Sequence, residues 1–139
     1  MYLHETTLRV RYAETDQMGF VYYGQYAAYF EVARVEAMRS LGISYRELEE
    51  AGIFMPVLDY HIRYIKPGRY DDELKIVTTI PVLPAVRIRF TYETFNSANE
   101  LLNKAETELV FLNRNNLRPV KAPTDLMERL AEYYSNDGI

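Results

Sequence analysis

The pattern of apolar and polar residues changes its period along this chain. In residues 6–12 apolar and polar positions alternate, so that Leu8, Val10 and Tyr12 share one face, which predicts a half-buried strand. In residues 24–41 apolar side chains instead recur every three or four positions, which predicts a helix of roughly five turns. The apolar stripe of this helix is Tyr26, Phe30, Ala33, Ala37 and Leu41.

The segments that follow predict a second helix, four strands and a terminal helix. Gly42 is a plausible stop for the long helix, and the spacing of Ser44 and Glu47 predicts a capping box that opens a short helix to about residue 51. Alternation then predicts strands at 58–64, 74–80, 86–93 and 104–111. A terminal helix is expected to about residue 134, with Thr124 or Asp125 as its N-cap.

These elements together predict one α+β domain over residues 1–139. Four strands joined by short turn-like segments suggest an antiparallel meander, and the long helix needs a sheet on which to bury its apolar stripe. A five-stranded antiparallel sheet wrapped around one long central helix satisfies both requirements. Because the edges of such a sheet commonly pair with a second copy, we expect a homodimer.

Composition narrows the possible functions. The chain has no cysteine, so disulfides and thiol-ligated metals are excluded, and its net charge of −4 argues against nucleic-acid binding. The longest uncharged run, residues 17–30, is too short to span a bilayer, so we expect a cytoplasmic protein without membrane association. The thirteen tyrosines fit either partly wet strand packing or an aromatic-lined acyl pocket.

The most informative candidate for chemistry is Asp16. Only two histidines are present, so a metal site is not expected, and no nucleophile elbow or phosphate loop occurs. Asp16 precedes a helix whose first turn, around Tyr22, Tyr23 and Gly24, offers unpaired backbone N–H groups to a developing oxyanion. The alternative is that Asp16 only orders its loop or caps the helix.

Two segments resemble a known family. Residues 11–34, RYAETDQMGFVYYGQYAAYFEVAR, are similar to the signature of 4-hydroxybenzoyl-CoA thioesterase-like hotdog proteins: an R-Y, a T-D, a glycine, a tyrosine or histidine, and Glu-x-x-Arg in the helix. Residues 62–76, IRYIKPGRYDDELKI, resemble the strand and turn that follow in that family. The resemblance covers nearly the whole chain.

The resemblance implies hydrolysis of an acyl-CoA thioester in a site at a dimer interface. It places the catalytic aspartate at Asp16, the backbone oxyanion donor around Tyr23 and Gly24, and an aromatic residue near the site at Tyr12. Many members have histidine at the position of Tyr23, so a histidine-assisted mechanism is excluded here. Asp16 could act as nucleophile or as general base, and both routes stay open.

The substrate itself suggests further residues. Coenzyme A carries phosphates, so basic residues should border the site; no metal and no cofactor other than the substrate's own coenzyme A is expected. The assembly is expected to be a homodimer or a dimer of dimers. Candidates for the phosphate contacts are Arg63, Lys66, Arg87 and Arg89.

Three alternatives accompany this assignment. Glu31 is the rival catalytic acid, although an i,i+3 ion pair with Arg34 that positions the helix is the expectation. A catalytically silent acyl-CoA-binding protein could have the same fold. A hotdog hydratase would require His61 as its site histidine.

Overall fold

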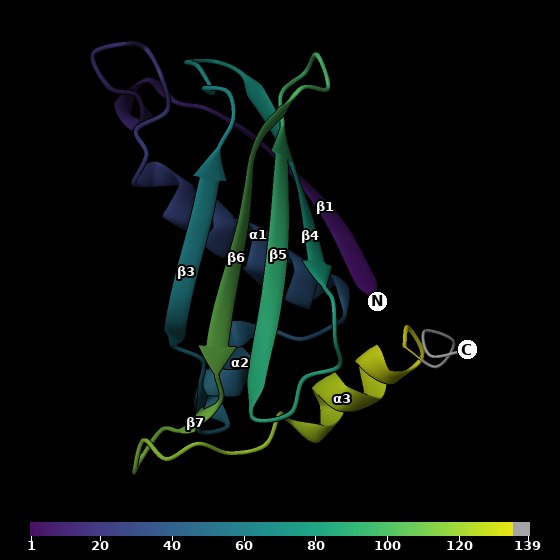
Figure 1. Cartoon of the computed structure of the whole chain (residues 1–139). Helices are drawn as coiled ribbons and strands as arrows, with labels where there is room; N and C mark the ends of the chain where they lie inside the picture. The colour runs from purple at the N-terminus through teal and green to yellow at the C-terminus, as the bar shows by residue number, and fades with distance from the viewer. Residues whose placement is uncertain (135–139) are drawn as a thin grey trace.

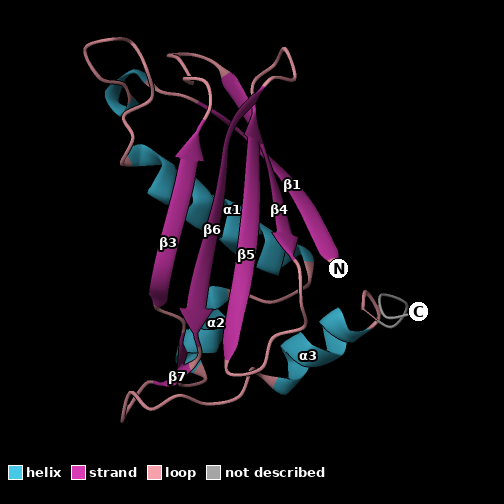
Figure 2. Ribbon diagram, in the orientation of Figure 1, coloured by secondary structure: helices cyan, strands magenta, loops and turns pink. Residues whose placement is uncertain are grey.

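A five-stranded antiparallel sheet packs along one long helix, as Figures 1 and 2 show. The computed structural model describes residues 1–134. The helical segments are η1 (Tyr12–Glu14), α1 (Gln25–Ser40), α2 (Tyr45–Glu50) and α3 (Thr124–Ala131). The strands are β1 (Tyr2–Arg9), β2 (Ile53–Phe54), β3 (Val57–Tyr64), β4 (Glu73–Ile80), β5 (Arg87–Phe95), β6 (Leu101–Val110) and β7 (Leu112–Asn113).

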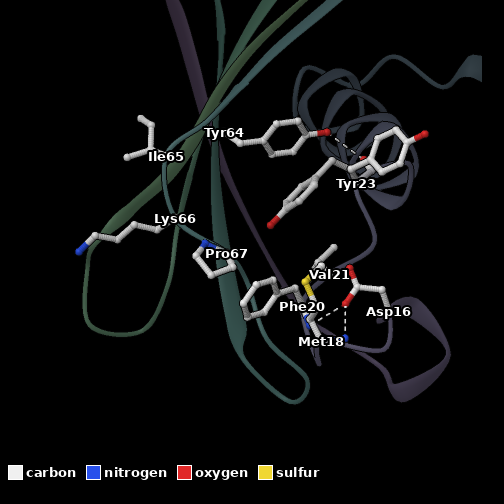
Figure 3. Close-up of a pocket in the computed structure, with 10 residues that line it drawn as sticks. Asp16, Met18, Phe20, Val21, Tyr23, Tyr64, Ile65, Lys66 and Pro67 are labelled. Atoms are coloured by element: carbon white, nitrogen blue, oxygen red, sulfur yellow. Dashed lines mark hydrogen bonds between the residues drawn. The ribbon is translucent and has the colours of Figure 1, made fainter.

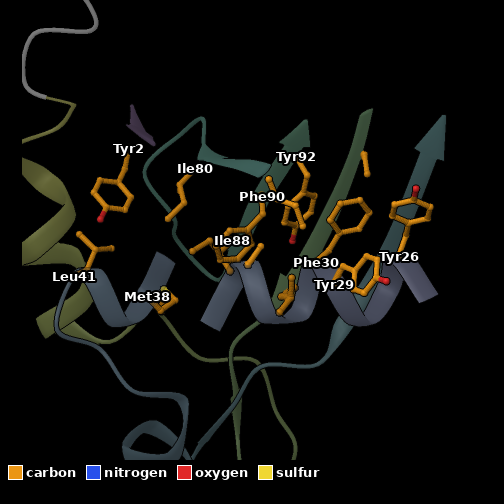
Figure 4. Packing of buried hydrophobic residues seen from close by; sticks show 14 of the residues in the cluster. Tyr2, Tyr26, Tyr29, Phe30, Met38, Leu41, Ile80, Ile88, Phe90 and Tyr92 are labelled. Carbon is orange, nitrogen blue, oxygen red and sulfur yellow. The ribbon is translucent and has the colours of Figure 1, made fainter. Parts of the chain in front are cut away.

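Helix α1 confirms the period seen in the sequence. All five residues of the predicted stripe are buried, and Ala33 and Ala37 are fully inaccessible, because small side chains let the helix approach the sheet closely. Aromatic rings fill the space between the two layers, with Phe30 of the helix stacked on Tyr92 of β5 at 4.5 Å between ring centroids (Figure 4). The helix is therefore held by its packing on the sheet.

The order of strands in the sheet differs from the predicted meander. The observed order is β1-β4-β5-β6-β3, so β4, β5 and β6 are consecutive, but β3 pairs with β6 and not with β4. The prediction of four strands in hairpin succession is wrong because residues 65–72 are not a hairpin turn: they cross the end of the sheet. The Gly68 carbonyl accepts from the Val21 amide at 2.8 Å, and the Asp72 carbonyl accepts from the Val10 amide at 2.9 Å. The crossing segment thus anchors the loop that precedes α1.

Smaller differences lie at the ends of elements. Strand β1 ends at Arg9 and the chain turns into η1, so Tyr12, predicted to face inward, is 78% exposed. The N-cap of α3 is Pro123 and neither Thr124 nor Asp125. The two-residue strands β2 and β7, which pair with each other, had no signal in the alternation. Within residues 1–134 no helix is long and apolar enough to span a membrane.

Candidate active site

Asp16 is held by the backbone of its own loop. Its Oδ1 accepts hydrogen bonds from the amides of Met18 at 2.9 Å and Phe20 at 3.2 Å, while its own amide donates to the Phe20 carbonyl at 2.8 Å. Within the described residues Oδ2 accepts no hydrogen bond. The side chain is half-buried, so this loop fixes the carboxylate while leaving one oxygen available.

A cleft of about 330 Å³ opens beside this carboxylate (Figure 3). Tyr23 from the segment before α1 and Lys66 from the crossing segment line it together with Asp16. A carboxylic side chain facing apolar walls in a cleft is a common setting for catalytic acids. The other walls are mostly apolar and include Met18, Phe20, Val21, Tyr26, Tyr64 and Pro67.

The start of α1 presents free backbone donors next to this cleft. Within the described residues the amides of Tyr23 and Gly24 donate to no acceptor, whereas the amide of Gln25 donates to the Tyr22 carbonyl at 2.8 Å. The Tyr64 hydroxyl donates to the Tyr23 carbonyl at 3.1 Å and so fixes that peptide from β3. Two unpaired N–H groups at a helix N-terminus favour negative charge, which suits an oxyanion.

Segment 22–24 separates this first cleft from a second. Tyr23 lines the first, and Gly24 lines a cleft of about 450 Å³ between α1 and the sheet. A Cβ on Gly24 would lie 2.9 Å from Cε2 of Tyr22, so glycine keeps the backbone accessible here. A ligand group bound at segment 22–24 could therefore reach into both clefts.

The tyrosines have different surroundings. Burial raises the pKa of Tyr26 to about 12, so this residue is a neutral phenol in the wall of the first cleft. Tyr22 and Tyr23 are exposed, with ring centroids 4.8 Å apart, and the hydrogen bond with Tyr23 raises the pKa of Tyr22. Tyr12 lies outside both clefts and contacts Tyr70 edge to face at 5.6 Å. No contact of Tyr12 with the cleft supports its predicted place near the site.

The structure separates the four candidate basic residues. Lys66 lines the first cleft, where its ammonium group pairs with Glu100. Arg87 and Arg89 pair with Glu108 at 2.9 Å and Glu106 at 2.7 Å across β5 and β6. Their buried neighbours Ile88 and Phe90 face the helix, so both arginines point to the opposite face of the sheet.

The same alternation places His61 and Arg63 on that opposite face. Both alternate along β3 with Tyr60 and Tyr64, whose rings contact the aromatic rings of α1 on the helix-facing side of the sheet. They line a separate depression with Lys104, away from Asp16. Within one chain, therefore, neither Arg63 nor His61 reaches the cleft of Asp16, and the hydratase alternative gains no support.

The expected ion pair between Glu31 and Arg34 is absent from the described residues. Arg34 is buried, and its Nη1 donates to the Tyr92 hydroxyl at 3.1 Å. Glu31 remains exposed, and both residues line the second cleft. The prediction is wrong because the Arg34 side chain turns into the core beneath β5 and does not extend along the helix surface.

Glu14 has a role that sequence reasoning did not find. It is 8% exposed and accepts from the Arg11 amide at 2.8 Å and from the Tyr29 hydroxyl at 2.9 Å. Burial alone would raise the pKa of Glu14, but these hydrogen bonds and the Arg11 guanidinium together lower it. Glu14 thus joins η1 to α1. The i,i+3 spacing from Arg11 was the one available signal.

Comparison with known proteins gives the family. Residues 10–130 match the family described as the thioesterase-like superfamily. The chain belongs to this superfamily. It is 33% identical to the YneP protein of Bacillus subtilis (strain 168) over 87% of this chain and 88% of that protein. It is 32% identical to the acyl-CoA thioester hydrolase YbgC of Escherichia coli O6:H1 over 86% and 90% of the two chains.

Solved structures of superfamily relatives agree with the fold. The DHNA-CoA thioesterase of Staphylococcus aureus is 34% identical and superposes with a TM-score of 0.92 over 100% of this chain and 97% of its own. Slr0204 of Synechocystis, at 21% identity, shows the same fold with a TM-score of 0.87 over 99% and 100% of the two chains. The α+β hotdog architecture predicted from the sequence is confirmed.

Proposed function

We propose that this chain hydrolyses acyl-CoA thioesters at the start of α1. The observation that carries the proposal is the Asp16 carboxylate, held by backbone amides in an apolar cleft that it shares with Tyr23. The thioester-hydrolase relatives named above support the same reaction class. The cleft would hold the thioester between the free oxygen of Asp16 and the amides of Tyr23 and Gly24.

In the proposed reaction the two amides act as oxyanion donors. The thioester carbonyl oxygen accepts from the N–H groups of Tyr23 and Gly24, which bear partial positive charge and stabilise the tetrahedral intermediate. In the nucleophilic route Oδ2 of Asp16 bonds to the acyl carbon, the C–S bond breaks, and the coenzyme A thiolate leaves and takes a proton. Water then cleaves the mixed anhydride and restores the carboxylate.

In the general-base route Asp16 accepts a proton from a water molecule that attacks the acyl carbon. The same C–S bond breaks, and the proton passes to the departing thiolate. Both routes use one free carboxylate oxygen and the same two donors. Label from ¹⁸O-water in Asp16 after turnover would identify the anhydride route with water attacking the Asp16 carbon, because the general-base route leaves both oxygens of Asp16 unexchanged.

Substrate binding extends the proposal to the rim of the cleft. Lys66 lies at the cleft and is the basic residue best placed to contact a coenzyme A phosphate. Arg63, Arg87 and Arg89 face the other side of the sheet, so they could contact coenzyme A only on a neighbouring copy of the chain. The exposed edge strand β3 is the surface through which we propose that two copies pair.

Replacement of Asp16 by asparagine tests the function. Asparagine keeps an oxygen for the amides of Met18 and Phe20 but is neither base nor nucleophile, so kcat for acyl-CoA hydrolysis should fall at least about a hundredfold. The matched control is Asp72→Asn, since Asp72 accepts from the Arg69 amide at 2.9 Å in the crossing segment but does not line the cleft. Free thiol release from a panel of acyl-CoAs gives the rates. Full activity of Asp16→Asn with an unchanged melting temperature would refute the proposal.

A further inference from the structure

The peptide that joins Tyr23 to Gly24 contains one of the proposed oxyanion donors. Its N–H group belongs to Gly24 and, within residues 1–134, donates to no acceptor. Its C=O group belongs to Tyr23. This peptide is trans and therefore planar, so the two groups point in nearly opposite directions. Whatever holds the Tyr23 carbonyl thus also sets the direction of the Gly24 N–H group.

A tyrosine side chain from the sheet holds this carbonyl. The Tyr64 hydroxyl donates to the Tyr23 carbonyl at 3.1 Å, and among the described residues that oxygen accepts no other hydrogen bond. The hydrogen bonds of α1 do not include it, because Tyr23 lies before the N-cap of the helix, Gly24. The orientation of peptide 23–24 therefore depends on Tyr64.

Two elements fix the position of Tyr64. It is the last residue of β3, where it pairs with Asn103 of β6, and its ring lies 5.8 Å from that of Tyr26 in α1. Figure 3 shows the Tyr64 side chain directed at Tyr23, beside the first cleft. Burial and the neighbouring Tyr23 raise the pKa of Tyr64, so its hydroxyl keeps its proton at neutral pH and acts as a donor.

A hydrogen bond to a peptide carbonyl also changes the N–H group of the same peptide. It draws electron density from the nitrogen toward the oxygen, which makes the N–H group a stronger donor, and hydrogen bonds in series strengthen one another in this way. A donor that is already fixed needs no reorganisation when negative charge develops on the substrate. The Tyr64 hydroxyl, peptide 23–24 and the substrate oxygen would form such a series.

We infer that Tyr64 is a positioning residue for the reaction: its hydroxyl orients and polarises peptide 23–24 and so strengthens the Gly24 N–H group as oxyanion donor. This inference rests on the proposed thioesterase function and deepens it. Tyr64 acts through the peptide and does not touch the reacting atoms. Because the charge on the substrate oxygen is largest in the tetrahedral intermediate, Tyr64 should stabilise that state more than the planar thioester.

Replacement of Tyr64 by phenylalanine tests the inference, because it removes the hydroxyl and keeps the ring. For the acyl-CoA that the wild type hydrolyses fastest, kcat should fall about tenfold with an unchanged KM, less than for loss of a direct donor. The matched control is Tyr134→Phe. The Tyr134 hydroxyl also donates to a backbone carbonyl, that of Ile80 at 2.5 Å, at the end of β4 far from the crossing segment. This control should keep the wild-type kcat.

Two coenzyme A analogues separate positioning from a structural role. S-trifluoroacetonyl-CoA carries a ketone that hydrates to a tetrahedral centre, whereas S-propyl-CoA has a chain of the same length without the oxygen. By calorimetry, Tyr64→Phe should raise the Kd of the ketone about tenfold and leave that of S-propyl-CoA unchanged. Equal weakening of both analogues, or an unchanged Kd of the ketone in folded Tyr64→Phe, would overturn the inference.

The inference and the proposed function fail in different ways. If the wild type hydrolyses no acyl-CoA but Tyr64→Phe selectively weakens binding of the ketone, the proposed hydrolysis is refuted and the role of Tyr64 at the donor is kept. If Asp16→Asn abolishes hydrolysis but Tyr64→Phe keeps the full kcat, the proposed function stands and the inference about Tyr64 is refuted.

Discussion

Glu14 and Asp16 are two acids of one loop with opposite surroundings. Glu14 is buried and its carboxylate is occupied by Arg11 and Tyr29, whereas Asp16 keeps one oxygen free beside the cleft. Glu14 therefore stabilises the loop that contains Asp16. Its role is structural, whereas the proposed catalytic role belongs to Asp16.

Replacement of Glu14 should cost stability in a pH-dependent way. Glu14→Gln removes a buried charge that accepts several hydrogen bonds, so the free energy of unfolding at pH 7 should fall by about 1–3 kcal/mol. Because folding lowers the pKa of Glu14 below its ordinary value of 4.5, its contribution is present above that pH and is lost as the pH falls through the lowered value.

Urea unfolding of wild type and Glu14→Gln between about pH 7 and about pH 3 measures this effect, and the difference between the two should shrink at the acid end. Glu50→Gln is the control, because Glu50 forms an exposed pair with Arg46 at 3.2 Å. A difference that stays constant across this pH range would contradict the assigned role of Glu14.

The residues found from sequence were those with a local signal. Asp16 and Tyr23 share a motif before one helix, and the structure brings both to one cleft. Glu14 was not found, because its partner Tyr29 comes from the next helix and the contact depends on the fold. The partner of Arg34 is likewise 58 residues away, so spacing along the helix suggested Glu31 in its place.

At the scale of elements, the end of α1 shows how a local signal can fix structure. Gly42 has a φ of +80°, its amide donates to Arg39, and the Ile43 amide donates to Met38, which together form a Schellman motif. Arg129 of α3 donates to the Leu41 carbonyl at 2.9 Å at the same place. The stop predicted from one glycine is thus also the contact between two helices.

Two glycine substitutions separate backbone strain from this contact. The Cβ of Gly42→Ala would clash with Nη1 of Arg129, while Gly52→Ala meets no atom within 4 Å at a similar φ of +92°. In both variants an alanine in the left-handed region should lower the free energy of unfolding by about 1 kcal/mol. Gly42→Ala should lower it by about 1 kcal/mol more, because the Arg129 hydrogen bond is lost. Thermal unfolding of both variants measures the difference, and equal losses would show that Arg129 adds no stability.

The order of the strands in the sheet could not be predicted from local sequence patterns. The turn residues of segment 65–72 resemble those of a hairpin, and alternation says nothing of which strand lies alongside. The pairing of β3 with β6 joins positions such as Tyr60 and Thr107, far apart in the chain. It is decided by how the whole sheet covers α1, so it could not be predicted from adjacent residues.

At the scale of the whole molecule, β3 is an edge strand of the five-stranded sheet. Among residues 1–134 it pairs only with β6, and its apolar residues Val57, Leu58, Tyr60 and Tyr64 are all exposed by more than a third. An edge strand with this composition is a template for pairing with another chain. The alternation predicted Leu58, Tyr60 and Tyr64 as one apolar face of a strand, and an apolar face left exposed at an edge is the pattern expected of a surface that a second copy covers.

Disruption of this edge tests the pairing and its link to activity. At micromolar concentration the wild type should sediment at twice 16.3 kDa, and Leu58→Lys should shift it to the monomer, because a lysine on an edge strand opposes pairing. Val82→Lys changes a residue of similar exposure outside the strands and should remain dimeric. Because Tyr64 of β3 holds the Tyr23 carbonyl, loosening this strand should also lower kcat/KM. A fully active monomeric wild type would contradict the proposed pairing and show that the cleft of one chain suffices for hydrolysis.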